Sequence, residues 1–213
     1  VGSNVSIPNM GLSKGEETRR GALPSLAWLV PGAVVLTALI LLLTGDAGRE
    51  WLRFERSGIA AGELWRLLTG HFVHLGVSHT VLNLAGLVLV WFMVGRAFDW
   101  KQWLWVMAGS IGAIDLGLWI GAPSLEGYVG LSGLLHGMLG AGIVAGLAAR
   151  SGEALILAVV VAGKLAWEQF SGPLPGSEAT SGGAVIVDAH LYGIIGGTLV
   201  AAMLIRVRGR ASI

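Results

Sequence analysis

The chain has 213 residues, of which 54% are hydrophobic and 13% are charged, and its formal net charge is +1. Soluble domains carry about a quarter charged residues, so this composition excludes an ordinary soluble fold and predicts a polytopic membrane protein. The near-zero net charge gives no basis for nucleic-acid binding. The sequence contains no cysteine, which excludes disulfides and thiolate chemistry.

Six apolar segments follow a polar amino-terminal stretch, and each approaches the roughly 20 residues that a helix needs to cross a membrane. We expect an all-α bundle of six transmembrane helices over residues 26–206, preceded by a disordered cytoplasmic segment at 1–25 and followed by a basic cytoplasmic tail at 207–213. Val1 precedes Met10, which is consistent with a processed leader or an expression remnant at residues 1–9. The expected spans are Leu26–Leu43, His79–Phe98, Trp103–Gly121, Ser132–Ala149, Ala154–Phe170 and Ala184–Ile205.

The positions of lysine and arginine predict the orientation of this bundle. On one side, basic residues flank the spans and occupy both terminal segments, whereas on the other side they are confined to the loop 44–78. Both termini are therefore expected in the cytoplasm, so that the second, fourth and sixth spans begin at the outer face. The loop 44–78 mixes aromatic, aliphatic and charged residues, which favours a position on the membrane surface.

Ser132 begins the fourth apolar segment, within Gly130-Leu131-Ser132-Gly133. The glycines Gly130 and Gly133 permit a tight turn and a close approach of another backbone. Unpaired N–H groups and the positive dipole end at a helix start favour an oxyanion. A nucleophilic serine fits this position, and so does a serine that only caps the helix.

His190 begins the last apolar segment and is the candidate base for Ser132. Small residues at four-residue spacing permit close packing of the two helices, namely Gly133 and Gly137 on one and Gly193 and Gly197 on the other. This packing would bring the imidazole to the hydroxyl, and a serine needs such a base to attack. The alternative is a histidine bonded to a backbone carbonyl. His136, one turn after Ser132, is interpreted as a stacking or hydrogen-bonding partner of His190.

His79 and Asn83 are four residues apart and therefore share one helical face. Both can donate hydrogen bonds to a developing oxyanion, and one such donor is worth about 3 kcal/mol of transition-state stabilisation. The alternative interpretation is a polar clasp between helices.

The remaining polar groups do not predict a metal site or a cofactor. The five histidines show no His-x-x-x-His or His-Glu-x-x-His pairing, although a metal-dependent membrane enzyme remains a rival hypothesis. Lys164 and Glu168 are four residues apart and are expected to form an ion pair. Their functional interpretation is a contact with the substrate or with an acceptor, in which Lys164 holds a carboxylate or a lipid phosphate.

Taken together, these motifs resemble the rhomboid intramembrane serine proteases over about residues 26–206. The residues that carry the resemblance are Trp65-Arg66 in the first loop, His74, His79 and Asn83 at the second helix, Gly130-Leu131-Ser132-Gly133 at the fourth, and His190, Gly193 and Gly197 at the sixth. The resemblance implies that Ser132 is the nucleophile and His190 the base of a dyad without a carboxylate. His79, Asn83 and the Ser132 N–H would form the oxyanion hole.

His136 stands where many rhomboids have a tyrosine, and the strings around it and around His190 resemble the rhombosortase branch. That resemblance implies a protease of the bacterial inner membrane whose active site opens toward the periplasmic leaflet. Its partners would be membrane lipids and client proteins that carry a Gly-Gly motif before a C-terminal hydrophobic helix and basic tail, with transfer to a lipid amine as a further possibility. The alternatives are a general rhomboid protease of single-pass membrane proteins and a non-catalytic rhomboid-like protein that binds client helices.

Overall fold

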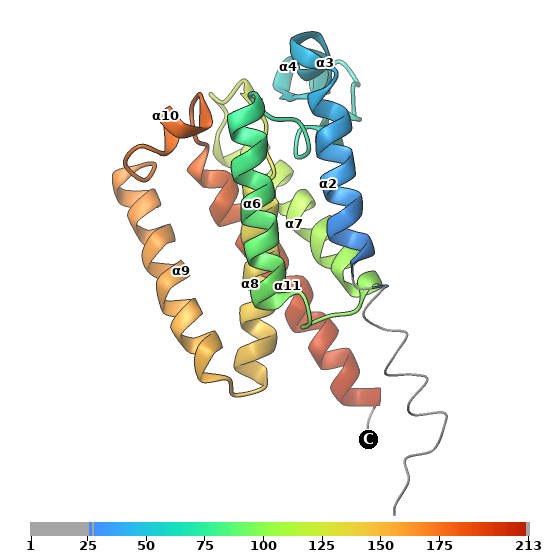
Figure 1. The fold of residues 1–213 in the computed structure, drawn as a ribbon, viewed down its shortest axis with the longest axis vertical. Helices are drawn as coiled ribbons and strands as arrows, with labels where there is room; N and C mark the ends of the chain where they lie inside the picture. Colours follow the sequence, from blue (N-terminus) through green and yellow to red (C-terminus); the bar gives the residue numbers. More distant parts are fainter. Residues whose placement is uncertain (1–25, 27, 212–213) are drawn as a thin grey trace, which may run out of the picture.

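The computed structural model describes residue 26 and residues 28–211, and this part of the chain is mostly helical. The segment 1–25, expected to be disordered, lies outside the described residues. Each predicted apolar segment coincides with a long helix of one bundle (Figure 1). These helices are α2 (Leu29–Leu42), α6 (Val77–Val94), α7 (Trp100–Gly121), α8 (Ser132–Ala148), α9 (Gly152–Ser171) and α11 (Val187–Ala211).

Four of the described helices, α6, α7, α9 and α11, are long and apolar enough to cross a membrane, where six spans were expected. The number is five if α2 and α3 (Gly45–Leu52) are counted as one span, although the two are bent by 117°. Helix α8 is apolar but only 17 residues long, about 26 Å at 1.5 Å per residue. Large apolar side chains such as Phe92 and Phe170 project outward from the bundle, as side chains that face lipid do.

Helix α8 occupies the centre of the bundle and contacts α6, α7, α9 and α11. Its approach to α11 depends on glycine, because a Cβ atom added to Gly193 or Gly197 would collide with the backbone of Gly133 or Gly137. The predicted pairing of small residues is therefore confirmed. Close backbone contact of this kind is how helices associate where no hydrophobic effect drives them together.

A small antiparallel sheet corrects the all-α expectation. Strand β1 (Phe54–Glu55), in the loop between α2 and α6, pairs with β2 (Gly127–Tyr128), in the loop between α7 and α8. The pairing gives backbone groups of two loop segments the partners that a helix would have supplied. Two short helices contact β1, namely α4 (Arg56–Ala60) and α5 (Arg66–Thr69), and a third, α10 (Ser177–Ser181), contacts α6.

Two arginines of the first loop bind backbone carbonyls, one fixing the loop to the bundle and the other holding the loop itself together. The Arg56 guanidinium donates to the carbonyls of Leu118 and Ala122, at the end of α7. Arg66 is buried and donates to two carbonyls of the same loop. Figure 1 shows α3, α4 and α10 at one end of the bundle, and the start of α2 and the end of α11 at the other. The first of these ends is where α6, α8 and α11 begin.

Candidate active site

The side chains of Ser132 and His190 meet between α8 and α11. Ser132 is the first residue of α8, His190 lies in the first turn of α11, and the Ser132 Oγ is 2.9 Å from the His190 Nε2. The hydroxyl donates to Nε2 when that nitrogen carries no proton, that is, when the neutral imidazole has its proton on Nδ1. This is the tautomer that a general base requires.

Glu168, on α9, is a third member of the site beside Ser132 and His190, and the sequence did not predict its contact with His190. Its Oε2 lies 3.0 Å from the His190 Nδ1, and the two residues are 3% and 4% exposed. The expectation of a Ser-His dyad without a carboxylate is therefore wrong, because a buried carboxylate accepts a hydrogen bond from the His190 Nδ1. A signal was available, because Glu168 shares its helical face with the buried Val161 and Leu165. The face of α9 that carries Glu168 had to point into the bundle.

Lys164 pairs with Glu168 as expected, at 2.6 Å between the ammonium and Oε1. The same ammonium lies 3.0 Å from the His136 Nε2. These two contacts direct the Lys164 ammonium at neighbouring side chains of the site. The interpretation of Lys164 as a holder of an external carboxylate or phosphate finds no support in this arrangement.

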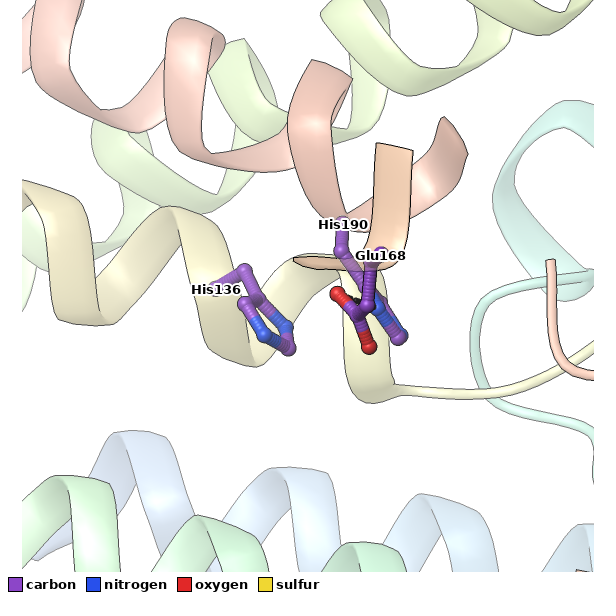
Figure 2. Close-up of side chains that lie close together, drawn as sticks. All are labelled: His136, Glu168 and His190. Carbon is purple, nitrogen blue, oxygen red and sulfur yellow. Dashed lines mark hydrogen bonds and ion pairs between the residues drawn. The ribbon is translucent and has the colours of Figure 1, made fainter. Parts of the chain in front are cut away.

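His136 stacks on His190, as predicted, with ring centroids 4.1 Å apart and planes 17° apart (Figure 2). Its Nδ1 is 2.7 Å from the Ser132 carbonyl, which can only accept. The Nδ1 of His136 therefore donates, and its Nε2 accepts from Lys164. With both nitrogens engaged, His136 is a support for His190 and is not placed as a base.

His136, Glu168 and His190 extend from α8, α9 and α11 toward one point (Figure 2), and their possible ligand atoms lie within 4.8 Å of one another. A divalent cation would suit this donor set by composition. However, the Lys164 ammonium already contacts two of the three residues, and its charge opposes a second cation at that distance. The geometry therefore favours a hydrogen-bonded network, in which the Lys164 ammonium is the cation, over a metal site.

Gly130 makes the turn that presents Ser132. Its φ of +120° is a conformation that residues with a side chain rarely adopt, and an added Cβ would lie 2.8 Å from the His79 Cε1. The Gly130 N–H donates to the Gly70 carbonyl at 3.1 Å, and the Gly130 carbonyl accepts from the Tyr128 hydroxyl at 2.7 Å. Burial raises the pKa of Tyr128, so this phenol remains a donor. The turn is thus held by groups on both sides.

His79 and Asn83 take different positions relative to this turn. The His79 Nδ1 accepts the Leu75 N–H at 3.3 Å, which leaves the proton of a neutral imidazole on Nε2, the atom beside Gly130. His79 is therefore placed as a donor next to the turn that presents Ser132. The Asn83 amide donates to the His79 carbonyl at 3.0 Å, and its NH2 group keeps a second N–H for another acceptor.

His71 and His74, the two histidines before α6, contact neighbouring elements of the fold. The His71 Nε2 is 3.1 Å from the Asp115 Oδ1, which links the loop to α7. The His74 ring contacts His79 edge-on at 5.1 Å. Burial, and to a lesser degree the neighbouring His79, lowers the pKa of His74 to about 4, so His74 is neutral at physiological pH.

The family model for the rhomboid domain matches residues 61–207, well over half of the chain. The chain belongs to the rhomboid family. Its apolar helices and this membership make it a multi-pass membrane protein.

Curated relatives of this rhomboid protein include the uncharacterized protein ML1171 of Mycobacterium leprae, 28% identical over 92% of this chain and 78% of the relative. The uncharacterized protein Rv1337 of Mycobacterium tuberculosis is 26% identical over 83% of this chain and 76% of the relative. The rhomboid protease GluP of Bacillus subtilis is 36% identical over 45% of this chain and 18% of its own length. No solved structure gives a significant match. The family and the GluP relative support an intramembrane serine protease.

Proposed function

We propose that this rhomboid protein cleaves peptide bonds at the membrane, with Ser132 as the nucleophile and His190 as the general base. The observation that carries the proposal is the 2.9 Å contact between the Ser132 Oγ and the His190 Nε2, in the tautomer that a base requires. A protein that only binds client helices has no need for this pairing. The non-catalytic alternative is therefore the weaker one.

The reaction follows the acyl-enzyme route. The Ser132 Oγ bonds to the carbonyl carbon of the substrate while its proton passes to the His190 Nε2. The oxyanion meets the first N–H groups of α8, which have no partner within the helix, and the Nε2 proton of His79. His190 then gives its proton to the leaving nitrogen as the carbon–nitrogen bond breaks. Water attacks the ester, its proton passes through His190 to the Ser132 Oγ, and a new carboxyl terminus is released.

The proposed setting is the bacterial inner membrane, with both termini in the cytoplasm and the site at the periplasmic leaflet. The distribution of lysine and arginine supports this orientation. The start of α2 and the end of α11 lie at the end of the bundle away from the start of α8, the helix whose first residue is Ser132 (Figure 1).

The proposed substrates are proteins with a Gly-Gly motif before a C-terminal hydrophobic helix and basic tail, as the resemblance to rhombosortases implies. Glycine suits the crowded turn at Gly130 and Ser132, since it lets a substrate backbone approach without side-chain collision. We include a second outcome for the acyl-enzyme, in which the amine of a lipid head group attacks in place of water. That step forms an amide and restores the Ser132 hydroxyl.

A client with this tail is co-expressed with the wild-type protein, with Ser132→Ala, or with Ser177→Ala as a control at a half-buried serine of α10. Intact mass spectrometry of the client gives the result. Loss of the tail with wild type and Ser177→Ala but not with Ser132→Ala is expected, and an added mass at the new C-terminus reveals transfer to an amine. Cleavage by Ser132→Ala refutes the proposed nucleophile. A client that stays intact in every case refutes the substrate class, and single-pass membrane proteins then test the general rhomboid alternative.

A further inference from the structure

We propose that Glu168 is a positioning residue that holds His190 in the tautomer of a general base, and that Lys164 and His136 fix the orientation of the Glu168 carboxylate. The inference rests on the proposed function, because it assigns roles around the same Ser132–His190 pair. It makes the site a Ser-His-Glu arrangement whose third member is supplied by α9.

The contacts form a chain in which each proton has one possible position. The Ser132 hydroxyl faces the His190 Nε2 at 2.9 Å, and the His190 Nδ1 faces the Glu168 Oε2 at 3.0 Å. An ionised carboxylate can only accept, so the Nδ1 of a neutral His190 keeps its proton and Nε2 stays free to take one. A charged His190, formed during attack, is stabilised by the same carboxylate.

Lys164 settles which way the carboxylate group turns. An ammonium can only donate, and this one lies 2.6 Å from the Glu168 Oε1 and 3.0 Å from the His136 Nε2. Oε1 is thereby engaged and Oε2 is directed at His190. His136 cannot supply a competing proton to the carboxylate, because its own proton is committed to the Ser132 carbonyl at 2.7 Å.

The fixed donor and acceptor roles of these groups predict an unusual result for Glu168→Gln. Glutamine has one accepting oxygen and one donating NH2 group, where glutamate has two acceptors. Lys164 can donate only to the oxygen, so the NH2 group is turned toward the His190 Nδ1. That nitrogen must then accept, the imidazole proton moves to Nε2, and His190 can no longer take the proton of Ser132.

Removing the donor should reverse the defect. In Lys164→Met/Glu168→Gln the amide oxygen is released and can rotate toward His190, which returns the proton to Nδ1. A second mutation beside the site would therefore raise the activity of the first variant. A side chain that merely fills space next to His190 would not produce this recovery.

The experiment measures kcat, KM and the pH profile for cleavage of the client in detergent. We expect kcat of Glu168→Gln to fall by about 10²–10⁴-fold with KM little changed, as when a triad carboxylate becomes an amide. Lys164→Met/Glu168→Gln should recover at least about tenfold of this loss, and Glu168→Asp, which keeps the charge, should retain more kcat than Glu168→Gln. Without a carboxylate to stabilise the charged imidazole, the acidic limb of the kcat profile, where the base becomes protonated, should also move in the recovered double variant.

A Glu168→Gln variant within about threefold of wild type, or a double variant no more active than Glu168→Gln, overturns the inference. If Glu168→Gln does not fold, Lys164→Met/Glu168→Gln is compared with Lys164→Met/Glu168→Leu, in which the leucine cannot accept a hydrogen bond from the His190 Nδ1. Equal rates of these two also overturn it. If the wild-type protein shows no cleavage that depends on Ser132, the proposed function itself has failed, and this outcome is distinct from both.

Discussion

Gly133→Ala tests whether the catalytic geometry depends on the contact of α8 with α11. An added Cβ would lie 2.8 Å from the Ala189 carbonyl oxygen, 3.0 Å from the Ile114 Cδ1 and 3.1 Å from the Tyr128 hydroxyl. Ordinary contact needs about 3.4 Å, so the start of α11 must withdraw by about 0.6 Å. His190 follows Ala189 directly, and the shift would stretch its 2.9 Å contact with Ser132 to about 3.5 Å, the limit of a hydrogen bond.

We expect this change to lower kcat by about 10–10²-fold, because catalysis is sensitive to displacements of about 1 Å, and to cost about 1–3 kcal/mol of stability through overpacking. Client cleavage and thermal melting in detergent measure the two effects. Gly112→Ala on α7 is the control, since its added Cβ meets nothing within 4 Å and alanine favours a helix. A Gly133→Ala variant that cleaves as fast as Gly112→Ala would refute the argument that close backbone packing sets the distance between Ser132 and His190.

Three other changes test separate parts of the site. Gly130→Ala, at φ +120° and with its Cβ 2.8 Å from His79, should cost about 1–3 kcal/mol in thermal melting and abolish cleavage. Lys164→Met removes the internal cation from a donor set within 4.8 Å, so zinc should inhibit this variant reversibly and leave the wild type unaffected in the same cleavage assay. Burial lowers the pKa of His74 from 6.5 to about 4, so its contribution to the free energy of unfolding is complete above pH 6.5 and is lost as the pH falls toward 4. The loss amounts to up to about 3 kcal/mol and should be seen as a falling melting temperature. In His74→Phe this acid loss should be smaller.

Each of these has a result that contradicts it. An active Gly130→Ala would show that the turn does not need its left-handed conformation. Equal zinc sensitivity of Lys164→Met and wild type would remove the argument that the ammonium excludes a metal. An acid loss that is identical in wild type and His74→Phe would assign the pH dependence to another group.

The sequence predicted the helices and their central contact because these depend on local pattern. Long apolar runs identify membrane helices, and the four-residue spacing of Gly193 and Gly197 marks a close-packing face. Once that face was paired with Gly133, the meeting of Ser132 and His190 followed. The boundaries differ by a few residues, since helix ends depend on capping, such as the Asp99–Gln102 capping box that starts α7.

The sequence did not predict the third member of the site because that depends on how α9 is rotated. Four-residue spacing pairs Lys164 with Glu168 on any helix and says nothing of what the second carboxylate oxygen contacts. That contact arises when the face bearing Val161 and Leu165 packs into the bundle. The β1–β2 pairing was missed for a similar reason, since two-residue strands far apart in sequence leave no periodic signal.

The shortness of α8 has a consequence for the depth of the active site in the membrane. At 17 residues this helix is about 26 Å long, less than the hydrocarbon thickness of about 30 Å, and it carries Ser132 as its first residue. Because α6, α7, α9 and α11 surround α8 and are long enough to span the bilayer, they meet the lipid and leave Ser132 recessed among them. Water for the hydrolysis of the ester must therefore come through the protein, from the end of the bundle at which α8 begins.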